Sequence, residues 1–349
     1  MPLSKLIAVS ISHPKLVKTT QAYEERYKKI RKELETIQEN EKNLGVDDSA
    51  RTIFTFQKKP DQANSIFFLH GYTCGNWQFN DMSRHFYRLG YNVILFNLPG
   101  HGIGTSKHLA YSTETQKLES FITARFSIMS AFKNDKHLVG FSAGGLLSTY
   151  IRVKHPHTFT SVTLLAPYFL PTDIKGLIGF TVFRLLEKHL SQAIPRILDF
   201  VPYSLKPRNN GVLSSNEPPK YPVISDTRLG HFYVLSKFFF DFLSTLTKSQ
   251  KGSKILAILT DCDRVASPII AKMVLSCFSN ITFKLFSQKE NLPHSFFDAS
   301  VKNNDLGIEE TLDLMEKHFK NTEEKKALLV QLLCLYHLKK IIHYPNQKR

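Results

Sequence analysis

Residues 137–154 read HLVGFSAGGLLSTYIRVK, and this stretch decides the fold class. Its first four residues form an apolar run of strand length, and residues 143–154 have the length of a helix. Between them lies Gly140-Phe141-Ser142-Ala143-Gly144, a G-x-S-x-G pattern. A strand, a sharp turn and a helix in this order predict a nucleophile elbow, which presents the serine hydroxyl above the sheet beside a helix N-terminus. Both glycines are expected because a side chain there would collide with the strand or the helix.

On both sides of this stretch, short apolar runs alternate with longer segments of helical length. The seven apolar runs are 52–56, 65–69, 92–98, 137–140, 161–165, 254–259 and 281–286. The helical segments between them are 77–89, 114–132, 143–154 and 269–278. Several runs are apolar almost throughout, as is typical of strands that helices cover on both faces. The alternation predicts a parallel, doubly wound α/β sheet.

A nucleophilic serine needs a histidine base and a carboxylate that orients it, and after an elbow these follow in the order acid, then histidine. The run 254–259 leads into Asp261 and Asp263, and the run 281–286 leads to His294. Both positions fall at the C-terminal ends of adjacent strands, where open α/β sheets bind ligands. We predict His294 as the base, since no other histidine follows a late strand. Asp263, which starts an Asp-Arg-Val turn, is the predicted acid, and Asp261 is the alternative.

The loop after the first central strand is the candidate for the oxyanion hole. It reads Leu69-His70-Gly71-Tyr72. The backbone N–H groups of Tyr72 and Ala143 are predicted to converge on a developing oxyanion, and Gly71 permits the close approach. His70 precedes the serine, which is the wrong side for the base, so we expect it to brace the loop.

These motifs together resemble the α/β-hydrolase superfamily, in particular its monoacylglycerol lipase, carboxylesterase and lysophospholipase-like branch (the serine aminopeptidase, or hydrolase-4, group). The matching motifs, in the family's order, are His70-Gly71, Asn97-Leu98-Pro99-Gly100-His101-Gly102, Gly140-Phe141-Ser142-Ala143-Gly144-Gly145, Asp263-Arg264-Val265 and His294. The resemblance implies a mostly parallel eight-stranded sheet flanked by helices, with a helical cap inserted after the sixth strand. It also implies a triad of Ser142, Asp263 and His294 with an oxyanion hole from Tyr72 and Ala143.

The expected domain organisation is one hydrolase core with additions at both ends. Residues 1–50 form an N-terminal helical extension, 51–320 the core with a cap at about 167–253, and 321–349 a C-terminal helical tail. One apolar stripe at helical spacing predicts the N-terminal helix: Tyr23, Tyr27, Ile30, Leu34 and Ile37. The tail contains ALLVQLLCLYHL at residues 327–338, between two lysine pairs. This segment is either a helix buried against the core or a helix that docks on a membrane surface or a partner.

The predicted cap is rich in large apolar side chains. They are Phe169, Leu170, Leu177, Ile178, Phe180, Val182, Phe183, Phe238, Phe239, Phe240 and Phe242. They either line an acyl pocket, since ligand pockets are mostly apolar, or pack a small core of their own. The first reading favours a lipid-like or acyl-glycerol ester as the small-molecule substrate.

Composition and charge exclude several classes of protein. The chain has 349 residues, a net charge of +16 and a mean hydropathy of −0.19. No apolar run reaches the ~18 residues of a membrane-spanning helix, and 27 Phe and 13 Tyr supply the apolar surface that disordered chains lack. The positive charge favours anionic partners. The sequence lacks the dense Lys/Arg cluster, interleaved with aromatic residues, that would predict nucleic-acid binding. The positive charge therefore predicts peripheral contact with an anionic membrane.

The compartment and cofactor expectations follow from cysteines, histidines and the N-terminus. Four dispersed cysteines, Cys74, Cys262, Cys277 and Cys334, contain no CxxC pair and favour a reducing, cytoplasmic location. The first residues contain no convincing signal peptide. His155 and His157 have no carboxylate or cysteine at ligand spacing, so no metal site is expected, and the triad chemistry needs no cofactor.

The expected activity is that of a serine hydrolase that cleaves carboxylic esters through an acyl-enzyme intermediate. Thioesterase, acyltransferase and serine peptidase activities remain open, because all of them use the same triad. A second class of function also remains open, in which the fold is a non-catalytic binding module at an acidic membrane or protein partner.

Overall fold

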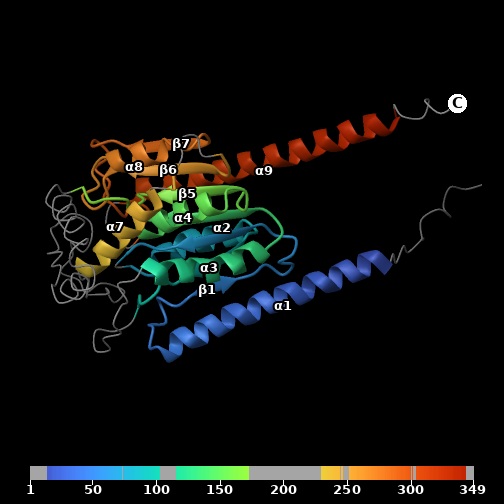
Figure 1. Cartoon of the computed structure of the whole chain (residues 1–349), viewed down its shortest axis with the longest axis horizontal. Helices are drawn as coiled ribbons and strands as arrows, with labels where there is room; N and C mark the ends of the chain where they lie inside the picture. The colour runs from blue at the N-terminus through green and yellow to red at the C-terminus, as the bar shows by residue number, and fades with distance from the viewer. Residues whose placement is uncertain are drawn as a thin grey trace, which may run out of the picture.

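The chain folds around one twisted sheet with helices on both faces (Figure 1). The computed structural model describes residues 14–72, 74–102, 115–172, 229–243, 245–246, 251–299, 301 and 304–342. In these residues the strands are β1 (Ile53–Thr55), β2 (Ser65–Leu69), β3 (Asn92–Phe96), β4 (Lys136–Phe141), β5 (Ser161–Leu165), β6 (Lys254–Thr260) and β7 (Ile281–Phe286). Their order in the sheet is β1-β3-β2-β4-β5-β6-β7. Only β1 runs antiparallel to its neighbour in this sheet, and the other pairs are parallel.

The helices lie in two layers over this sheet. They are α1 (Pro14–Asn43), η1 (Asn76–Phe79), α2 (Asn80–Arg88), α3 (Thr115–Ala131), α4 (Ala143–Lys154), α7 (Leu229–Leu243), α8 (Pro268–Leu275) and α9 (Asp305–Ile342). Side chains of α1, α3, α4, α7 and α8 share one apolar core with one face of the sheet. Side chains of η1, α2 and α9 share a second core with the other face. The predicted doubly wound α/β class is therefore confirmed.

The central strands have the buried composition that their sequences predict. Every residue of β2, β3 and β5 is buried. In β2, Phe67 and Leu69 enter one core, while Ile66 and Phe68 enter the other. Because successive side chains of a strand point to opposite faces, only a continuous apolar run can fill both cores.

Two details that the family resemblance implied are wrong. The sheet formed by the described residues has seven strands and not eight, which matches the seven apolar runs of the sequence. The chain ahead of β1 is helical from Pro14 to Asn43, because burying Tyr27, Ile30 and Leu34 together requires a helical period. Among the described strands, the predicted cap consequently follows β5, the fifth, and not a sixth. Most of that cap, residues 173–228, lies outside the described residues.

The described helix of the predicted cap region packs into the main core. Phe238, Phe239 and Phe242 of α7 are each at most 2% exposed. The Phe238 ring lies 4.8 Å from that of Tyr150 on α4, and the Phe239 ring lies 5.3 Å from that of Phe169. These three phenylalanines therefore stabilise the fold. The prediction that cap side chains line an acyl pocket concerns mainly residues that lie outside the described part of the chain.

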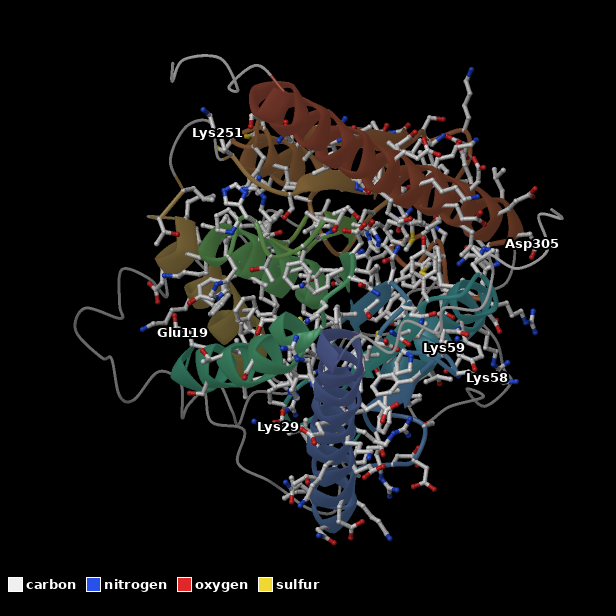
Figure 2. All side chains as sticks on the ribbon, turned by 90° about the vertical axis from the view of Figure 1, so that its right-hand side faces the viewer. Lys29, Lys58, Lys59, Glu119, Lys251 and Asp305 are labelled. Carbon is white, nitrogen blue, oxygen red and sulfur yellow. The ribbon has the colours of Figure 1, made fainter. Side chains whose placement is uncertain are left out.

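Helices α1 and α9 lie on opposite faces of the sheet and extend beyond it (Figure 2). Lys29 and its neighbours Lys28 and Arg26 are exposed on α1, as predicted for its charged face. Helix α9 continues without a break past residue 320 and through residues 327–338, whose side chains lie outside the described ones. Within the described residues, no helix combines the length and apolar character needed to cross a membrane.

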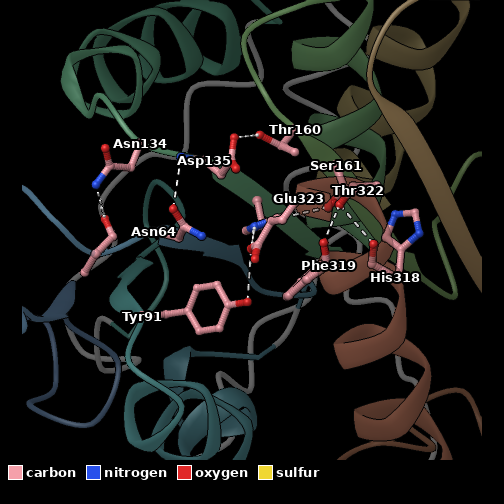
Figure 3. Close-up of polar contacts among 12 residues, drawn as sticks. Asn64, Tyr91, Asn134, Asp135, Thr160, Ser161, His318, Phe319, Thr322 and Glu323 are labelled. Atoms are coloured by element: carbon pink, nitrogen blue, oxygen red, sulfur yellow. Dashed lines mark hydrogen bonds and ion pairs between the residues drawn. The ribbon is translucent and has the colours of Figure 1, made fainter. Parts of the chain in front are cut away.

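A cluster of polar side chains attaches α9 to the N-terminal ends of the central strands (Figure 3). The Glu323 carboxylate of α9 accepts a hydrogen bond from His137 Nε2–H of β4 (2.9 Å) and another from the Tyr91 hydroxyl (3.1 Å). The Ser161 hydroxyl donates to the other ring nitrogen of His137 at 2.7 Å. Burial and the adjacent Glu323 raise the pKa of Tyr91. These bonds fix the position of α9. Because His137 is fully buried, it cannot contact a substrate.

Candidate active site

Ser142 lies in a strained turn between β4 and α4, as the G-x-S-x-G pattern predicts. Its backbone has φ 51° and ψ −114°, a conformation that non-glycine residues seldom adopt. Two hydrogen bonds hold it there: Ser142 N–H donates to the Leu165 carbonyl (3.0 Å), and Tyr168 N–H donates to the Ser142 carbonyl (2.9 Å). Backbone hydrogen bonds to the end of β5 and to the residues just after it thus hold Ser142 in this strained conformation. Strained backbone conformations persist where the surrounding structure fixes them in this way.

The two glycines of the motif are required by close backbone contacts. A Cβ atom at Gly144 would lie 2.0 Å from the Leu69 carbonyl oxygen, and one at Gly140 would lie 2.3 Å from the Gly144 carbonyl oxygen. Both obstacles are backbone atoms and cannot rotate away. The first turn of α4 can therefore pack directly against the end of β2, which brings Ser142 next to the loop that follows β2.

Asp263 and His294 form a buried pair at the ends of β6 and β7. His294 Nδ1–H donates to Asp263 Oδ2 at 2.6 Å, and the two side chains are 8% and 2% exposed. The other carboxylate oxygen, Oδ1, accepts the backbone N–H groups of Val265 and Ala266, both at 2.8 Å. These three bonds fix the carboxylate and place the His294 proton on Nδ1.

The geometry separates Asp263 from the alternative, Asp261. Asp261 is exposed, and its backbone N–H donates to the Phe286 carbonyl. Asp263 lies in the turn after β6, where its own N–H donates to the Thr260 carbonyl and its side chain turns inward. The side chain that meets the histidine is thus the one predicted by the turn sequence.

The other ring nitrogen of His294, Nε2, is the one that is not bonded to Asp263. Nε2 is buried and, among the described residues, has no hydrogen-bond partner. The His294 ring lies 4.8 Å from the ring of Phe141, the residue before Ser142. A serine–histidine hydrogen bond is often long without substrate and tightens in the substrate complex. Nε2 is therefore the basic atom that this arrangement leaves available.

The loop after β2 contacts Ser142 directly. A Cβ atom at Gly71 would lie 3.3 Å from Ser142 Cβ and 2.7 Å from the Phe141 ring, so Gly71 permits this approach. Ala143, the other expected donor residue, is fully buried and is the first residue of α4. Its N–H points from a helix N-terminus, where backbone N–H groups favour negative charge. Tyr72 follows Gly71 and is half-buried.

His70 braces this loop, as expected. Its ring is fully buried, and burial lowers the pKa of His70 to about 4, so the ring is neutral near pH 7. Nδ1–H donates to the Gly71 carbonyl (2.8 Å), and Leu98 N–H donates to Nε2 (3.0 Å). The His70 carbonyl accepts the Gly144 N–H at 3.1 Å. One residue thereby joins the loops after β2 and β3 to the first turn of α4.

Thr52 and Glu41 also reach this network, and sequence reasoning assigned them no role. The sequence predicts Thr52 as the first residue of an apolar run and places Glu41 in the N-terminal helical extension. Their contacts with each other and with Asn97 span between 11 and 45 residues of sequence. No local pattern predicts contacts of this kind.

The sheet order, the elbow at Ser142 and the acid–histidine pair together define the α/β-hydrolase fold. A sequence model described as alpha/beta hydrolase fold matches residues 64–222 of the chain. The chain therefore has this fold, and the sequence-based prediction of its class is confirmed.

Solved structures with the same fold include several enzymes. The metagenome-derived lipolytic enzymes LipS and LipT yield a TM-score of 0.53 at 16% identity, covering 78% of this chain and all (100%) of that chain. A monoacylglycerol lipase of Paleococcus ferrophilus yields 0.54 at 14% identity, covering 76% and 98%. Est1E of Butyrivibrio proteoclasticus, solved with ferulic acid, yields 0.50 at 14% identity, covering 77% and 95%. At these identities the similarity establishes the fold alone.

One curated relative is similar over a short part of the chain. It is the dihydrolipoyllysine-residue acetyltransferase component of the acetoin cleaving system of Cupriavidus necator. The two are 33% identical over 115 residues, which are 32% of this chain and 29% of the relative. The chain thus matches less than a third of that protein's length.

Proposed function

We propose that this protein is a serine hydrolase that cleaves carboxylic esters through an acyl-enzyme intermediate. The observation that carries the proposal is the buried Asp263–His294 pair. Its Nε2 has no hydrogen-bond partner among the described residues, and its ring lies 4.8 Å from that of Phe141, the residue before Ser142. A nucleophile on an elbow, a histidine and an orienting carboxylate are the parts that acyl transfer needs.

The proposed mechanism uses each group in the state that the geometry favours. Ser142 Oγ attacks the acyl carbonyl while His294 Nε2 takes its proton, and Asp263 stabilises the resulting imidazolium through Nδ1–H. The N–H groups of Tyr72 and Ala143 stabilise the oxyanion of the tetrahedral intermediate. His294 then protonates the leaving alcohol, and the alcohol departs. Water attacks the acyl-enzyme with His294 again as base, which releases the acid and restores Ser142.

Lipid-like or acyl-glycerol esters are the proposed substrate class. Two solved structures with this fold are a monoacylglycerol lipase and lipolytic enzymes, and this supports the proposal by analogy. Est1E, the neighbour solved with ferulic acid, is the reason to include esters of hydroxycinnamic acids in any screen. Thioesters and aminoacyl amides belong in the same screen, because the same triad serves those reactions.

A fluorophosphonate probe is expected to label the protein at Ser142, since such probes phosphonylate a serine only where a base activates it. The same protein is expected to hydrolyse p-nitrophenyl esters, with kcat/KM highest for medium or long acyl chains. Peptide mass spectrometry would locate the label, and Ser142→Ala is the control. A well-folded protein that is neither labelled nor active on esters, thioesters or amides would favour a non-catalytic binding module.

We also propose peripheral contact with anionic lipid surfaces. The net charge is +16, and the N-terminal end of α1 and the C-terminal end of α9 extend in the same direction beyond the sheet (Figure 1). Lys325, Lys326, Lys339 and Lys340 flank the apolar stretch 327–338 of α9. The protein is expected to sediment with vesicles that contain phosphatidylserine. About 0.5 M salt should release it, because the attraction between exposed charges is largely screened at that ionic strength. Equal sedimentation with neutral vesicles would contradict this proposal.

A further inference from the structure

The N-terminal helix α1 lies outside the part of the chain that the hydrolase sequence model matches, yet hydrogen bonds connect it through Thr52 to the loop after β3. Glu41, near the C-terminal end of α1, is only 8% exposed. Its two carboxylate oxygens accept hydrogen bonds from one residue, Thr52: the backbone N–H at 2.6 Å and the hydroxyl at 2.7 Å. A charged acceptor makes such bonds strong, and burial makes them costly to leave unmade.

The bond to Glu41 also orients the Thr52 hydroxyl. Because that hydroxyl donates its proton to Glu41, its oxygen is left to accept, and it accepts the Asn97 N–H at 3.1 Å. Asn97 begins the loop after β3. The N–H of the next residue, Leu98, donates to His70 Nε2 at 3.0 Å. The end of β3 is thus held between Thr52 on one side and His70 on the other.

Other contacts join the segment after α1 to the same loops. Asp47 N–H donates to the Gly102 carbonyl at 2.7 Å, and a Cβ atom at Gly102 would lie 2.4 Å from Ala50 Cβ. The Asn76 side-chain amide, just past the oxyanion loop, donates to the Arg51 carbonyl at 2.8 Å. Segment 46–52 is therefore packed against the loops after both β2 and β3.

The charges of Arg125, which is half-buried, and of Arg51 favour the ionised form of Glu41. Arg125 of α3 stacks over the rings of Phe96 and Phe121, at 5.7 and 5.0 Å from their centroids. Burial raises the pKa of Glu41, and the bonds from Thr52 together with the charge of Arg125 oppose that rise. Thr52 and the neighbouring arginines thus favour the carboxylate form of Glu41, which accepts both hydrogen bonds.

We propose that Glu41 and Thr52 are positioning residues for the candidate oxyanion hole. Thr52 fixes the end of β3, the end of β3 fixes the His70 ring, and His70 holds Gly71 and the first turn of α4 through its ring and its carbonyl. The donors of Tyr72 and Ala143 then keep their spacing while charge develops on the substrate. This inference rests on the proposed hydrolase function and assigns the N-terminal extension a part in it.

The test compares Thr52→Val, which keeps the shape and removes the hydroxyl, with Thr52→Ser, which keeps the hydroxyl, and with Glu41→Gln. Glu39→Gln is the matched control, since Glu39 lies on the same helix with a side chain that is 61% exposed. We expect Thr52→Val and Glu41→Gln to lower kcat by about tenfold with KM unchanged, because small displacements of catalytic groups cost about that much or more. Thr52→Ser and the control should retain wild-type kcat.

A transition-state analogue separates positioning from simple loss of stability. An alkyl trifluoromethyl ketone forms a hemiketal oxyanion on the serine, so its affinity should fall by the same factor as kcat. The double variant of Glu41→Gln and Thr52→Val should be no worse than Thr52→Val alone. Both substitutions act on Asn97 through the Thr52 hydroxyl, which Thr52→Val already removes, and a glutamine amide oxygen can still accept the Thr52 N–H. Variants that melt at a lower temperature but keep wild-type kcat and ketone affinity below that temperature would overturn the inference.

Amide hydrogen exchange gives a readout that does not depend on activity. In Thr52→Val, the peptide that contains residues 69–75 should exchange about tenfold faster than in Glu39→Gln, because its anchor through His70 is loosened. Unchanged exchange would overturn the coupling even in an active enzyme. A wild-type protein without ester hydrolysis or fluorophosphonate labelling would instead overturn the proposed function, while the exchange experiment still decides whether α1 holds this loop.

Discussion

Replacing Ser142 with alanine is expected to lower kcat for ester hydrolysis by about 10⁶-fold, to near the background rate. Removing the nucleophile of a serine triad costs about this much, because the remaining groups bind the substrate but have no acyl acceptor. The fold should survive. In the described part of the chain the Ser142 hydroxyl makes no hydrogen bond, and the turn is held by backbone bonds to Leu165 and Tyr168. The melting temperature should therefore change little.

The matched control is Ser148→Ala, on the same helix. The Ser148 hydroxyl is buried and has no hydrogen-bond partner among the described residues, so its removal should leave both kcat and fluorophosphonate labelling at wild-type levels. The measurements are initial rates on a p-nitrophenyl ester, labelling with the probe, and thermal unfolding. Full activity of the Ser142→Ala protein would sink the proposed mechanism.

Replacing Asp263 with asparagine is expected to lower kcat by about 10⁴-fold, the loss known for this change in serine triads. The reason can be derived from the bonds. Oδ1 accepts two backbone N–H groups, from Val265 and Ala266, so the new amide NH₂ cannot occupy that position. It must face His294 Nδ1, which then accepts a hydrogen bond and carries no proton. The proton moves to Nε2, and His294 can no longer take a proton from Ser142.

Asp261→Asn is the control for this substitution, with the same chemical change two residues away. Asp261 is exposed, and its hydrogen bond to the Phe286 carbonyl is made by its backbone. We therefore expect kcat to stay within about threefold of wild type, because surface substitutions usually have small effects. Both proteins should be compared by kcat on one ester and by thermal unfolding. If Asp261→Asn were the inactive variant, the assignment of the acid would be wrong.

Most of the fold could be predicted from short stretches of sequence. The seven apolar runs correspond to the seven strands of the described sheet, and the helix predicted at residues 143–154 has the bounds of α4. This succeeds because a strand buried on both faces needs an unbroken apolar run, which few other structures tolerate. The eighth strand came from the family resemblance and from no run of residues, and it is absent from the described sheet.

Local chemistry was also enough to predict the candidate nucleophile, base and acid. A serine between two glycines after an apolar run has few structural explanations, and Asp263 and His294 both follow predicted strands. What remained open was which aspartate meets the histidine. Asp261 and Asp263 are two residues apart in the same turn, and their environments differ only once the turn is folded.

The folded chain was needed for everything that joins distant segments. Glu41 meets Thr52, Thr52 meets Asn97, and His137 meets Glu323 across 186 residues of sequence. Each of these contacts depends on how strands and helices stack, which is set by the filling of the two cores and leaves no periodic signal at the residues involved. Residue patterns thus predicted the candidate reacting groups, while the contacts that hold these residues in place, including those from α1, emerged only from packing.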